Sequence, residues 1–368
     1  MTRAAVIRAK NAPVEISEVN LEDPKPGEVR ITLAASGVCH SDLSLLNDTI
    51  PLPPPIIAGH EGAGVIDAVG EGVEAVKPGD HVVISWVPQC GHCFCCTRGQ
   101  GYLCETSQLA NMMGTQLDLT TRFSDPDGTP IVCMAGAGTF AEQTVVHESA
   151  VVKINPDMPL DKAALIGCGV LTGYGAAVNT ASIREGDIVA VIGCGGVGLN
   201  AIQGAVHQGA SKVVAVDMMP NKLEMAKTFG ATDTINPSEG NPVEALQAIS
   251  GGRGADVVLE VVGIIPTIRQ AIDMTRRGGE TILVGLPSID AVMDFSPPMD
   301  SIIAAKTLKG CWYGSSNVQA DVPKLVDAYL NGSLKLDELV SRRITLDDVN
   351  EAFEAMGSGE VARSVIIY

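Results

Sequence analysis

Hydrophobic and polar residues follow two different rhythms along the chain. Up to about residue 154, short runs rich in β-branched residues are broken by Gly and Pro, as at the turns Lys25-Pro26-Gly27-Glu28 and Lys77-Pro78-Gly79-Asp80. This pattern predicts strands and an irregular barrel or sandwich. The predicted strands are Val14 to Val19, Val29 to Ala34, Gly64 to Val69, His81 to Ser85, Thr144 to Val146 and Val151 to Ile154.

From Leu160 the pattern changes to apolar runs that alternate with helical stretches such as Lys222 to Phe229. Alternation of this kind is typical of a doubly wound, parallel α/β sheet. Its predicted strands are Val189 to Ile192, Val213 to Val216, Val257 to Leu259 and Thr281 to Val284. After Gly310 we expect helices at Val322 to Leu330 and Asp347 to Met356, and a last strand, Ser364 to Ile367, that returns to the first domain.

The turn after Val189 to Ile192 carries Gly193, Gly195 and Gly198 at G-x-G-x-x-G spacing. With a strand before it and a helix after it, this motif predicts a dinucleotide site with the pyrophosphate at the helix N-terminus. Asp217 ends the next strand, 19 residues past Gly198, where a carboxylate can accept hydrogen bonds from ribose hydroxyls. Because that carboxylate would repel a 2′-phosphate, the sequence favours NAD over NADP.

Composition narrows the class further. The 368 residues suit two domains, and a formal net charge of −18 disfavours binding to a nucleic-acid backbone. The N-terminal residues lack the apolar core of a signal peptide and no run approaches 18 consecutive apolar residues, so we expect a cytoplasmic protein without a membrane span. Ten cysteines in such a protein are better explained by metal binding than by disulfides.

One short loop carries four of these cysteines at spacings of two, two and seven intervening residues: Cys90, Cys93, Cys96 and Cys104. Four thiolates can surround one Zn²⁺ tetrahedrally and leave no position for water, which predicts a structural zinc site. Cys95 is a fifth thiol in the loop, and spacing alone favours Cys96 over it.

A second set of possible ligands is spread along the chain, at Cys39, at His60 with Glu61, and at Cys168. Two thiolates and an imidazole form the set that leaves a fourth zinc position open for catalysis. Sequence spacing does not show whether these residues meet.

The order and spacing of these motifs resemble the zinc-containing medium-chain alcohol dehydrogenases, from about Val14 to Tyr368. The resemblance implies a GroES-like catalytic domain at 1–172, a Rossmann domain at 173–312 and a return to the catalytic domain at 313–368. The long segment from Glu105 to Gly138 resembles the liver-type enzymes and the thiol-dependent formaldehyde dehydrogenases. By analogy with dimeric relatives, we expect a homodimer that pairs edge strands near Leu308.

The resemblance also implies roles for single residues. Cys39, His60 and Cys168 would hold a catalytic zinc, with Glu61 as an alternative ligand and Asp42 fixing the imidazole. Ser41 would accept the proton of the alcohol, but the histidine that completes this relay in the family is Ser44 here. Ser41 and Asp42 are also typical helix N-cap residues, which is the alternative explanation for both.

Cofactor and substrate contacts follow from the same resemblance. The expected cofactor residues are His40, Gly193, Gly195, Gly196, Val197, Gly198, Asp217, Lys222, Val262, Val284 and Arg363. The expected substrate pocket contains Trp86, Phe140 and Leu286. Trp86 would favour small or unbranched primary alcohols; the alternative is that it is only an aromatic residue of the core. For Lys222, the alternative to a cofactor contact is an exposed lysine on a helix.

These observations predict a zinc- and NAD-dependent alcohol dehydrogenase that interconverts primary alcohols and aldehydes. A wider substrate range would include secondary alcohols and ketones. A first alternative is a thiol-dependent formaldehyde dehydrogenase. Gln108, where glutathione-dependent enzymes carry an arginine, counts against glutathione, while VAVIGCGGVG and WYGSSN are similar to the mycothiol-dependent enzymes. A second, remote alternative is a non-catalytic NAD-binding protein, from which the catalytic ligands would usually be missing.

Overall fold

The computed structural model describes residues 1–357 and 363–368, which form two compact units. The first comprises Met1–Cys168 and Asn317–Tyr368, and the second Gly169–Ser316. The sequence boundaries after residues 172 and 312 lie a few residues from these divisions.

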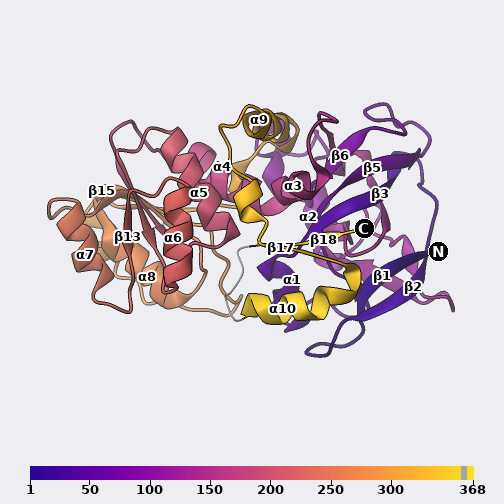
Figure 1. Ribbon diagram of the computed structural model, residues 1–368, viewed down its shortest axis with the longest axis horizontal. Helices are drawn as coiled ribbons and strands as arrows, with labels where there is room; N and C mark the ends of the chain where they lie inside the picture. The colour runs from indigo at the N-terminus through magenta and orange to yellow at the C-terminus, as the bar shows by residue number, and fades with distance from the viewer. Residues whose placement is uncertain (358–362) are drawn as a thin grey trace. The chain divides into compact units, whose positions relative to one another are not determined.

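The first unit is built on two β-sheets (Figure 1). One is a closed barrel in the order β1 (Thr2–Ile7), β2 (Glu15–Leu21), β7 (Phe123–Ser124), β8 (Pro130–Cys133) and β4 (Ile56–Ile57). The other has seven strands, in the order β10 (Val151–Lys153), β6 (His81–Ile84), β5 (Glu61–Val69), β3 (Glu28–Gly37), β18 (Ser364–Ile367) and β17 (Arg342–Ile344), with β9 (Gln143–His147) also pairing with β3.

Alternating apolar residues explain why these strands pack. Ile31 and Leu33 of β3, Ile66 of β5 and Val82 of β6 are buried together in one hydrophobic cluster. The helices of this unit are α1 (His40–Leu46), α2 (Glu105–Met113), α3 (Leu160–Leu165), α9 (Val318–Leu330) and α10 (Val349–Gly357). The sequence pattern did not predict α2, whose mixed composition gives little apolar periodicity.

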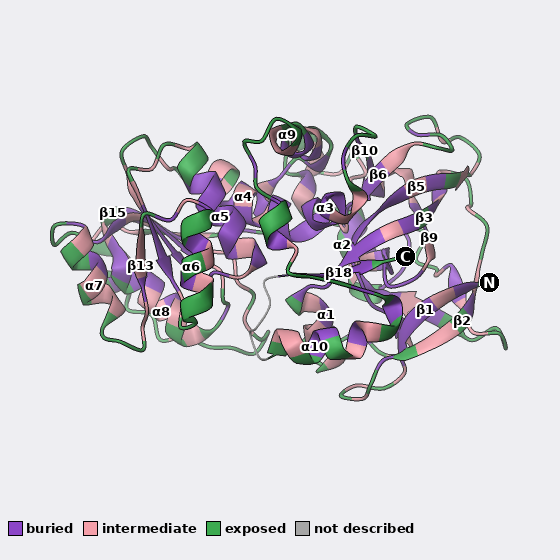
Figure 2. Ribbon diagram, viewed as in Figure 1, coloured by how far each residue is buried: buried purple, intermediate pink, exposed green. Residues whose placement is uncertain are grey.

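The second unit contains a parallel sheet of six strands whose apolar runs are buried between helices (Figure 2). Its order is β13 (Asp233–Ile235), β12 (Lys212–Val216), β11 (Ile188–Ile192), β14 (Ala255–Glu260), β15 (Thr275–Leu283) and β16 (Thr307–Gly310). The helices are α4 (Leu171–Gly175), α5 (Gly196–His207), α6 (Pro220–Thr228), α7 (Pro242–Ile249) and α8 (Ile265–Met274). The strand order reverses between β11 and β14, which is where doubly wound sheets bind ligands.

Among the described residues, one helix, Leu160–Thr180, is long and apolar enough to cross a membrane. However, 72% of its most apolar window is buried inside the protein, as expected for a core helix. It contains two π-helical turns, Ile166–Val170 and Ala176–Thr180.

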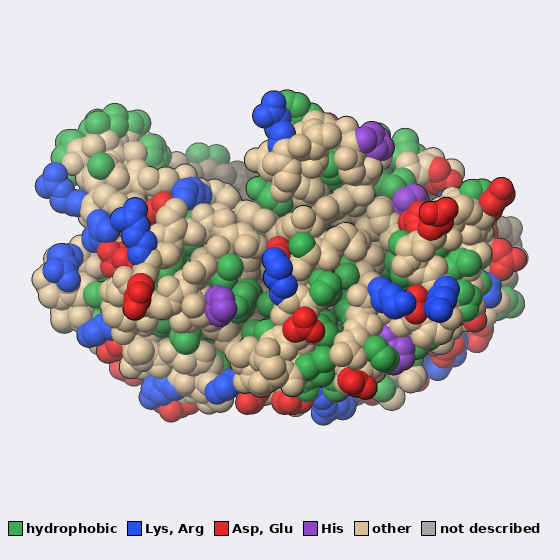
Figure 3. Space-filling model, turned by 90° about the horizontal axis from the view of Figure 1, so that it is seen from above, with side chains coloured by type: hydrophobic (Ala, Val, Ile, Leu, Met, Phe, Trp, Pro, Cys, Tyr) green, Lys and Arg blue, Asp and Glu red, His purple; other side chains and the backbone are tan. Residues whose placement is uncertain are grey.

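On the face shown in Figure 3, basic side chains lie among acidic ones instead of forming one continuous basic surface.

Candidate active site and metal centres

The pairing of β3 with β5 brings Cys39 and His60 together. The two strands are antiparallel, and Gly37 at the end of β3 lies opposite Glu61 at the start of β5. Cys39 follows β3 by two residues and is the N-cap of α1, while His60 directly precedes β5. Both side chains therefore leave the sheet at the same end.

Cys168 reaches the same point from another element. It lies in the π-helical turn that follows α3, and α3 packs against both β3 and β5. The Sγ atoms of Cys39 and Cys168, a His60 ring nitrogen and a Glu61 carboxylate oxygen all lie within 4.8 Å of one another. All four residues are buried. A tetrahedron of ligands about 2.3 Å from Zn²⁺ has edges of about 3.8 Å, so the donors fit one zinc ion.

Asp42 orients the imidazole. Its Oδ1 lies 3.2 Å from His60 Nδ1 and accepts from Gly59 N, while its Oδ2 accepts from Cys39 N at 2.9 Å. Burial lowers the pKa of His60, but Asp42 and Cys39 raise it more, so the net pKa lies well above the ordinary value. With Nδ1 facing Asp42, the other ring nitrogen is available to a metal.

A hydrogen bond between the Cys39 and Cys168 thiols shifts their pKa values in opposite directions. This bond lowers the pKa of Cys39 and raises that of Cys168, and burial raises both. A nearby cation, Arg363, further lowers the pKa of Cys39. The arrangement favours a thiolate at Cys39, which is the form that binds zinc.

Glu61 and Arg363 form a buried ion pair beside these ligands, with 3.1 Å between Glu61 Oε1 and Arg363 Nη1. Arg363 also donates to the carbonyl oxygen of Val38 at 3.2 Å. Burial raises the pKa of Glu61 to about 7. Within the described part of the chain, neither Glu61 carboxylate oxygen accepts a hydrogen bond, so Arg363 is its charged partner, and Glu61 lies close enough to the other three donors to join them as a ligand. The structure thus places Arg363 against a candidate ligand, and its pyrophosphate contact stays a prediction.

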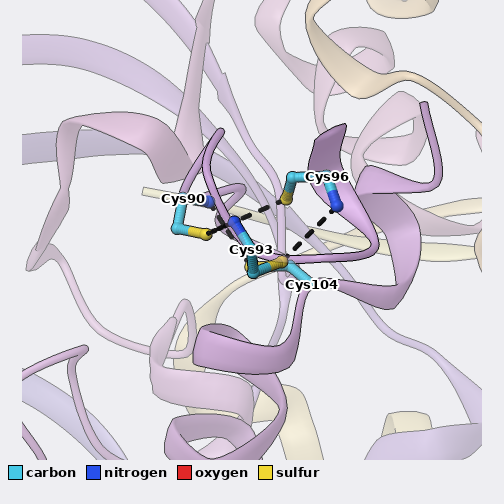
Figure 4. Close-up of side chains that lie close together, drawn as sticks. All are labelled: Cys90, Cys93, Cys96 and Cys104. Atoms are coloured by element: carbon cyan, nitrogen blue, oxygen red, sulfur yellow. Dashed lines mark hydrogen bonds between the residues drawn. The ribbon is translucent and has the colours of Figure 1, made fainter. Parts of the chain in front are cut away.

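The four-cysteine loop forms a second donor set, also within 4.8 Å, from Cys90, Cys93, Cys96 and Cys104 (Figure 4). Three sulfurs accept backbone N–H bonds: Cys90 N donates to Cys104 Sγ, Cys93 N to Cys90 Sγ and Cys96 N to Cys93 Sγ, at 3.3–3.4 Å. Backbone N–H donors of this kind stabilise thiolates. Four thiolates suit a structural zinc site. The group includes Cys96 and not Cys95, in agreement with the spacing.

The remaining predicted site residues of the first unit differ in their burial and in their distance from the ligand cluster. Ser41 Oγ lies 3.8 Å from Cys39 Sγ, and the Trp86 ring meets the His60 ring edge-on with 6.5 Å between centroids. Asn111 of α2 donates to the Trp86 carbonyl oxygen at 2.8 Å. Phe140 is fully buried in a hydrophobic cluster that also contains Phe353, so its contact with a substrate stays a prediction. His40 is exposed.

In the second unit, the glycine motif forms the expected strand, turn and helix. Gly193 has a φ of 95°, and a Cβ on Gly198 would collide with the Gly193 carbonyl oxygen, so both positions require glycine. Gly195 is the N-cap of α5, and the helix begins with Gly196, Val197 and Gly198. A Cβ on Gly195 would meet nothing within 4 Å, so the backbone there is open to a ligand. These features fit a dinucleotide phosphate.

Asp217 follows β12, and its carboxylate accepts from Cys194 N at 2.8 Å and Met219 N at 2.9 Å. It therefore lies beside the glycine turn. Lys222 is half-buried on α6, Val262 and Leu286 are exposed, and Val284 is half-buried at the end of β15.

Sequence reasoning missed two residues that organise these sites, Glu260 and Asn111, and it assigned Arg363 to the cofactor without its pairing with Glu61. Glu260 ends β14 and binds the backbone of two neighbouring turns; Asn111 supports Trp86; and Arg363 pairs with Glu61. Glu260 had a usable signal, because it is an acid directly after the apolar run Val257–Leu259, which places it at the ligand-binding end of a predicted parallel strand.

Comparisons with known proteins agree with this description. Residues 25–156 match the model of the alcohol dehydrogenase GroES-like domain, and residues 196–331 match that of the zinc-binding dehydrogenases. The chain is 40% identical to S-(hydroxymethyl)glutathione dehydrogenase of Paracoccus denitrificans, over 100% of both chains.

Two solved structures are similar over the whole chain. An alcohol dehydrogenase zinc-binding domain protein from Burkholderia ambifaria has a TM-score of 0.95 and 34% identity, covering 100% of this chain and 98% of that one. Benzyl alcohol dehydrogenase from Acinetobacter calcoaceticus has a TM-score of 0.92 and 31% identity, with 100% and 99% covered.

A Rossmann unit combined with a GroES-like unit that carries two clusters of zinc ligands defines a zinc-dependent dehydrogenase. The chain belongs to the medium-chain zinc alcohol dehydrogenases, in the subgroup that resembles the formaldehyde dehydrogenases. It is an NAD-dependent oxidoreductase with two zinc sites, as the sequence predicted.

Proposed function

We propose that the protein oxidises the adduct of formaldehyde with a low-molecular-weight thiol. The substrate carbon carries a hydroxyl and a thioether, and the product is the thioester of formic acid. The carbon loses a hydride, which NAD accepts to become NADH, and the hydroxyl loses a proton to the medium. The observation that carries the proposal is the buried cluster of Cys39, His60 and Cys168 in a chain that is 40% identical, over its full length, to an S-(hydroxymethyl)glutathione dehydrogenase.

The ligand residues would work as a unit. Cys39, His60 and Cys168 would hold the catalytic zinc, with Asp42 keeping the imidazole in one tautomer and Glu61 close enough to exchange with them. Zinc bound there supplies a Lewis acid that lowers the pKa of a hydroxyl group. Ser41, beside Cys39, would accept the hydroxyl proton. Since residue 44 is a serine, onward transfer would use another group or water.

The second unit would bind NAD. The N–H groups at the start of α5 would bind the pyrophosphate, Asp217 the ribose hydroxyls, and Val262 and Val284 would line the site at the ends of β14 and β15. The remaining contacts with NAD would come from Lys222, Arg363 and His40.

The thiol would differ from glutathione. Gln108 is exposed on α2, and its neutral amide would bind a carboxylate far less strongly than an arginine. Mycothiol is an adduct-forming thiol without the two free carboxylates of glutathione, and we expect it, or a thiol of similar polarity, to be preferred.

A second candidate is the oxidation of primary alcohols. Trp86 lies edge-on to His60, where its ring would stack beside a flat or unbranched substrate, and benzyl alcohol dehydrogenase is among the similar structures. This activity would need no thiol. The exposed Leu286 would add apolar surface to the pocket, and the fully buried Phe140 would support the pocket wall from behind.

An assay of NADH formation separates the two. Formaldehyde is supplied alone, with glutathione and with mycothiol, and benzyl alcohol and ethanol are tested without thiol. The first proposal expects formaldehyde oxidation only when a thiol is present, and thiol-independent oxidation of formaldehyde contradicts it. If benzyl alcohol alone is oxidised, the second candidate is supported. Cys168→Ala, with retained fold by circular dichroism, should lose each activity, and a Cys168→Ala variant of normal rate contradicts the metal assignment.

We also propose a cytoplasmic homodimer. Strand β16 is the edge of its sheet, and the preceding segment exposes apolar side chains that a second copy would cover. These are Ile289, Val292, Met299, Ile302 and Ile303. Light scattering should report twice the chain mass, and Ile302→Asp should yield monomers. A monomeric wild type contradicts the proposal.

A further inference from the structure

Glu260 occupies the switch point of the parallel sheet. It is the last residue of β14, lies opposite Ile192 of β11 and is fully buried. The next residue, Val261, donates its N–H to the Ile192 carbonyl oxygen at 2.9 Å. The side chain thus lies between the end of β14 and the strand that leads into the glycine turn.

The Glu260 carboxylate is bound by the turn that follows β14 and by the first turn of α8. Its Oε1 accepts from Val262 N at 2.9 Å, from Gly263 N at 2.9 Å and from Thr267 Oγ1 at 2.7 Å. In the described parts of the chain, Glu260 makes no ion pair. A buried carboxylate without a cation is costly unless its oxygens are hydrogen-bonded. These bonds therefore tie the conformation of the turn to this carboxylate.

The backbone of Glu260 binds a second turn. Its carbonyl oxygen accepts from Val284 N at 2.8 Å and Gly285 N at 3.0 Å, at the end of β15. One residue therefore fixes the turns that follow two neighbouring strands.

The turn at Val262 also touches the glycine motif. A Cβ placed on Gly193 would lie 2.7 Å from Val262 Cγ2, so the valine covers the start of the glycine turn. Gly263 has a φ of 81°, which allows the turn to bend sharply below the valine. The exposed Val262 side chain thus forms a wall at the ligand-binding edge of the sheet.

We propose that Glu260 is a positioning residue for the dinucleotide. Its carboxylate holds Val262 and Gly263, and its carbonyl holds Val284, so that both turns keep the spacing that the cofactor requires before it binds. The inference rests on the dinucleotide site of the proposed function. It predicts that losing the carboxylate weakens the cofactor complex by loosening the turns.

The main test uses Glu260→Ala and Glu260→Gln, with NADH affinity measured by fluorescence titration. The alanine variant should bind NADH about tenfold more weakly, because Val262 N, Gly263 N and Thr267 Oγ1 all lose their carboxylate acceptor. The glutamine variant keeps an oxygen that can accept at the Oε1 position and should stay within about threefold of the wild type. An alanine variant that folds and binds NADH within about twofold of the wild type overturns the proposal.

Hydrogen exchange without cofactor supplies a second readout. The amides of Val262 and Gly263 should exchange faster in Glu260→Ala, while Gln restores their protection. Unchanged exchange overturns the proposal. If the wild type binds no NADH, the dinucleotide site and this inference both fail; if it binds NADH but does not oxidise thiol adducts, only the substrate assignment fails.

A milder pair of variants decides the matter if Glu260→Ala does not fold. Thr267→Val removes one of the hydrogen bonds to the carboxylate and should weaken NADH binding about threefold. The matched control is Thr275→Val, since Thr275 is a buried hydroxyl at the opposite end of β15 that bonds to Ala271 O and Thr281 Oγ1. Equal NADH affinities for the two variants overturn the proposal.

Discussion

Asp42 Oδ1 lies 3.2 Å from His60 Nδ1, and both side chains are buried beside two thiols. Because Asp42 also accepts from Cys39 N, a single carboxylate orients two candidate ligands.

Asp42→Asn should therefore lower the affinity of the catalytic site for zinc. An amide has one acceptor oxygen where the carboxylate has two, so it cannot accept from both His60 and Cys39 N. Loss of such a partner typically reduces zinc affinity or activity about 10- to 100-fold. Competition with a coloured chelator measures the affinity. Asp347→Asn, at an exposed aspartate, is the control, and equal affinities for the two variants would contradict the expected role of Asp42.

Two adjacent cysteines offer a matched test of the structural site. Cys96→Ser should reduce the zinc content by one ion per chain and lower the melting temperature by about 10 °C, because the loop loses its closed shell of ligands. Cys95→Ser should change neither quantity, since Cys95 is outside the group of four. Metal analysis and thermal unfolding check both. Equal zinc contents in the two variants would refute the assignment.

The choice of cofactor should depend on the charge of Asp217. Asp217→Asn keeps an acceptor for the glycine turn but removes the repulsion of a 2′-phosphate, so the preference for NAD over NADP should fall about tenfold. Ratios of kcat/KM measure this preference. Asp233→Asn, on the neighbouring strand β13, should retain it. If Asp217→Asn keeps the wild-type ratio, another residue selects the cofactor.

Acid should weaken the first unit through Asp118. Burial raises the pKa of this group, but hydrogen bonds from Thr120 and Arg122 lower it more, to well below the ordinary 3.8. Because the folded pKa is depressed, the unfolded chain binds the proton more readily, and the stabilisation is present above about pH 4 and is lost as the pH falls through the folded pKa.

Asp118→Asn should thus lower the free energy of unfolding by about 0.5–1 kcal/mol at pH 7, a discounted value because the side chain is partly exposed. The difference from the wild type should shrink as the pH falls below about 4. Urea unfolding at pH 7 and pH 3 measures both effects. The exposed Asp157→Asn serves as the control, and a difference that grows towards low pH would contradict the sign.

The sequence predicted best what lies within short segments. All four thiols of the zinc loop come from residues 90–104, and the glycine motif lies in one strand, turn and helix, so their local geometry follows from spacing. Strand and helix positions were close, although β15 begins at Thr275 instead of Thr281 because polar residues open it.

The positions of the catalytic ligands depend instead on the pairing of strands that are far apart in the sequence. Cys39 and His60 meet because Gly37 lies opposite Glu61, and Arg363 reaches the same place because Val365 also lies opposite Gly37. No local pattern encodes these registers. Only the resemblance to a family predicted that the ligands converge, and it did not predict that Arg363 would pair with Glu61.

Cys104 is both a candidate zinc ligand and the residue from which α2 starts. Within residues 90–104 only Gly101 and Cys104 are buried, so the loop has little apolar packing of its own and would depend on the metal for its order. A newly made chain that finds no zinc would offer this loop to proteases. The cellular abundance of the protein would then follow the supply of zinc, even at a constant rate of synthesis.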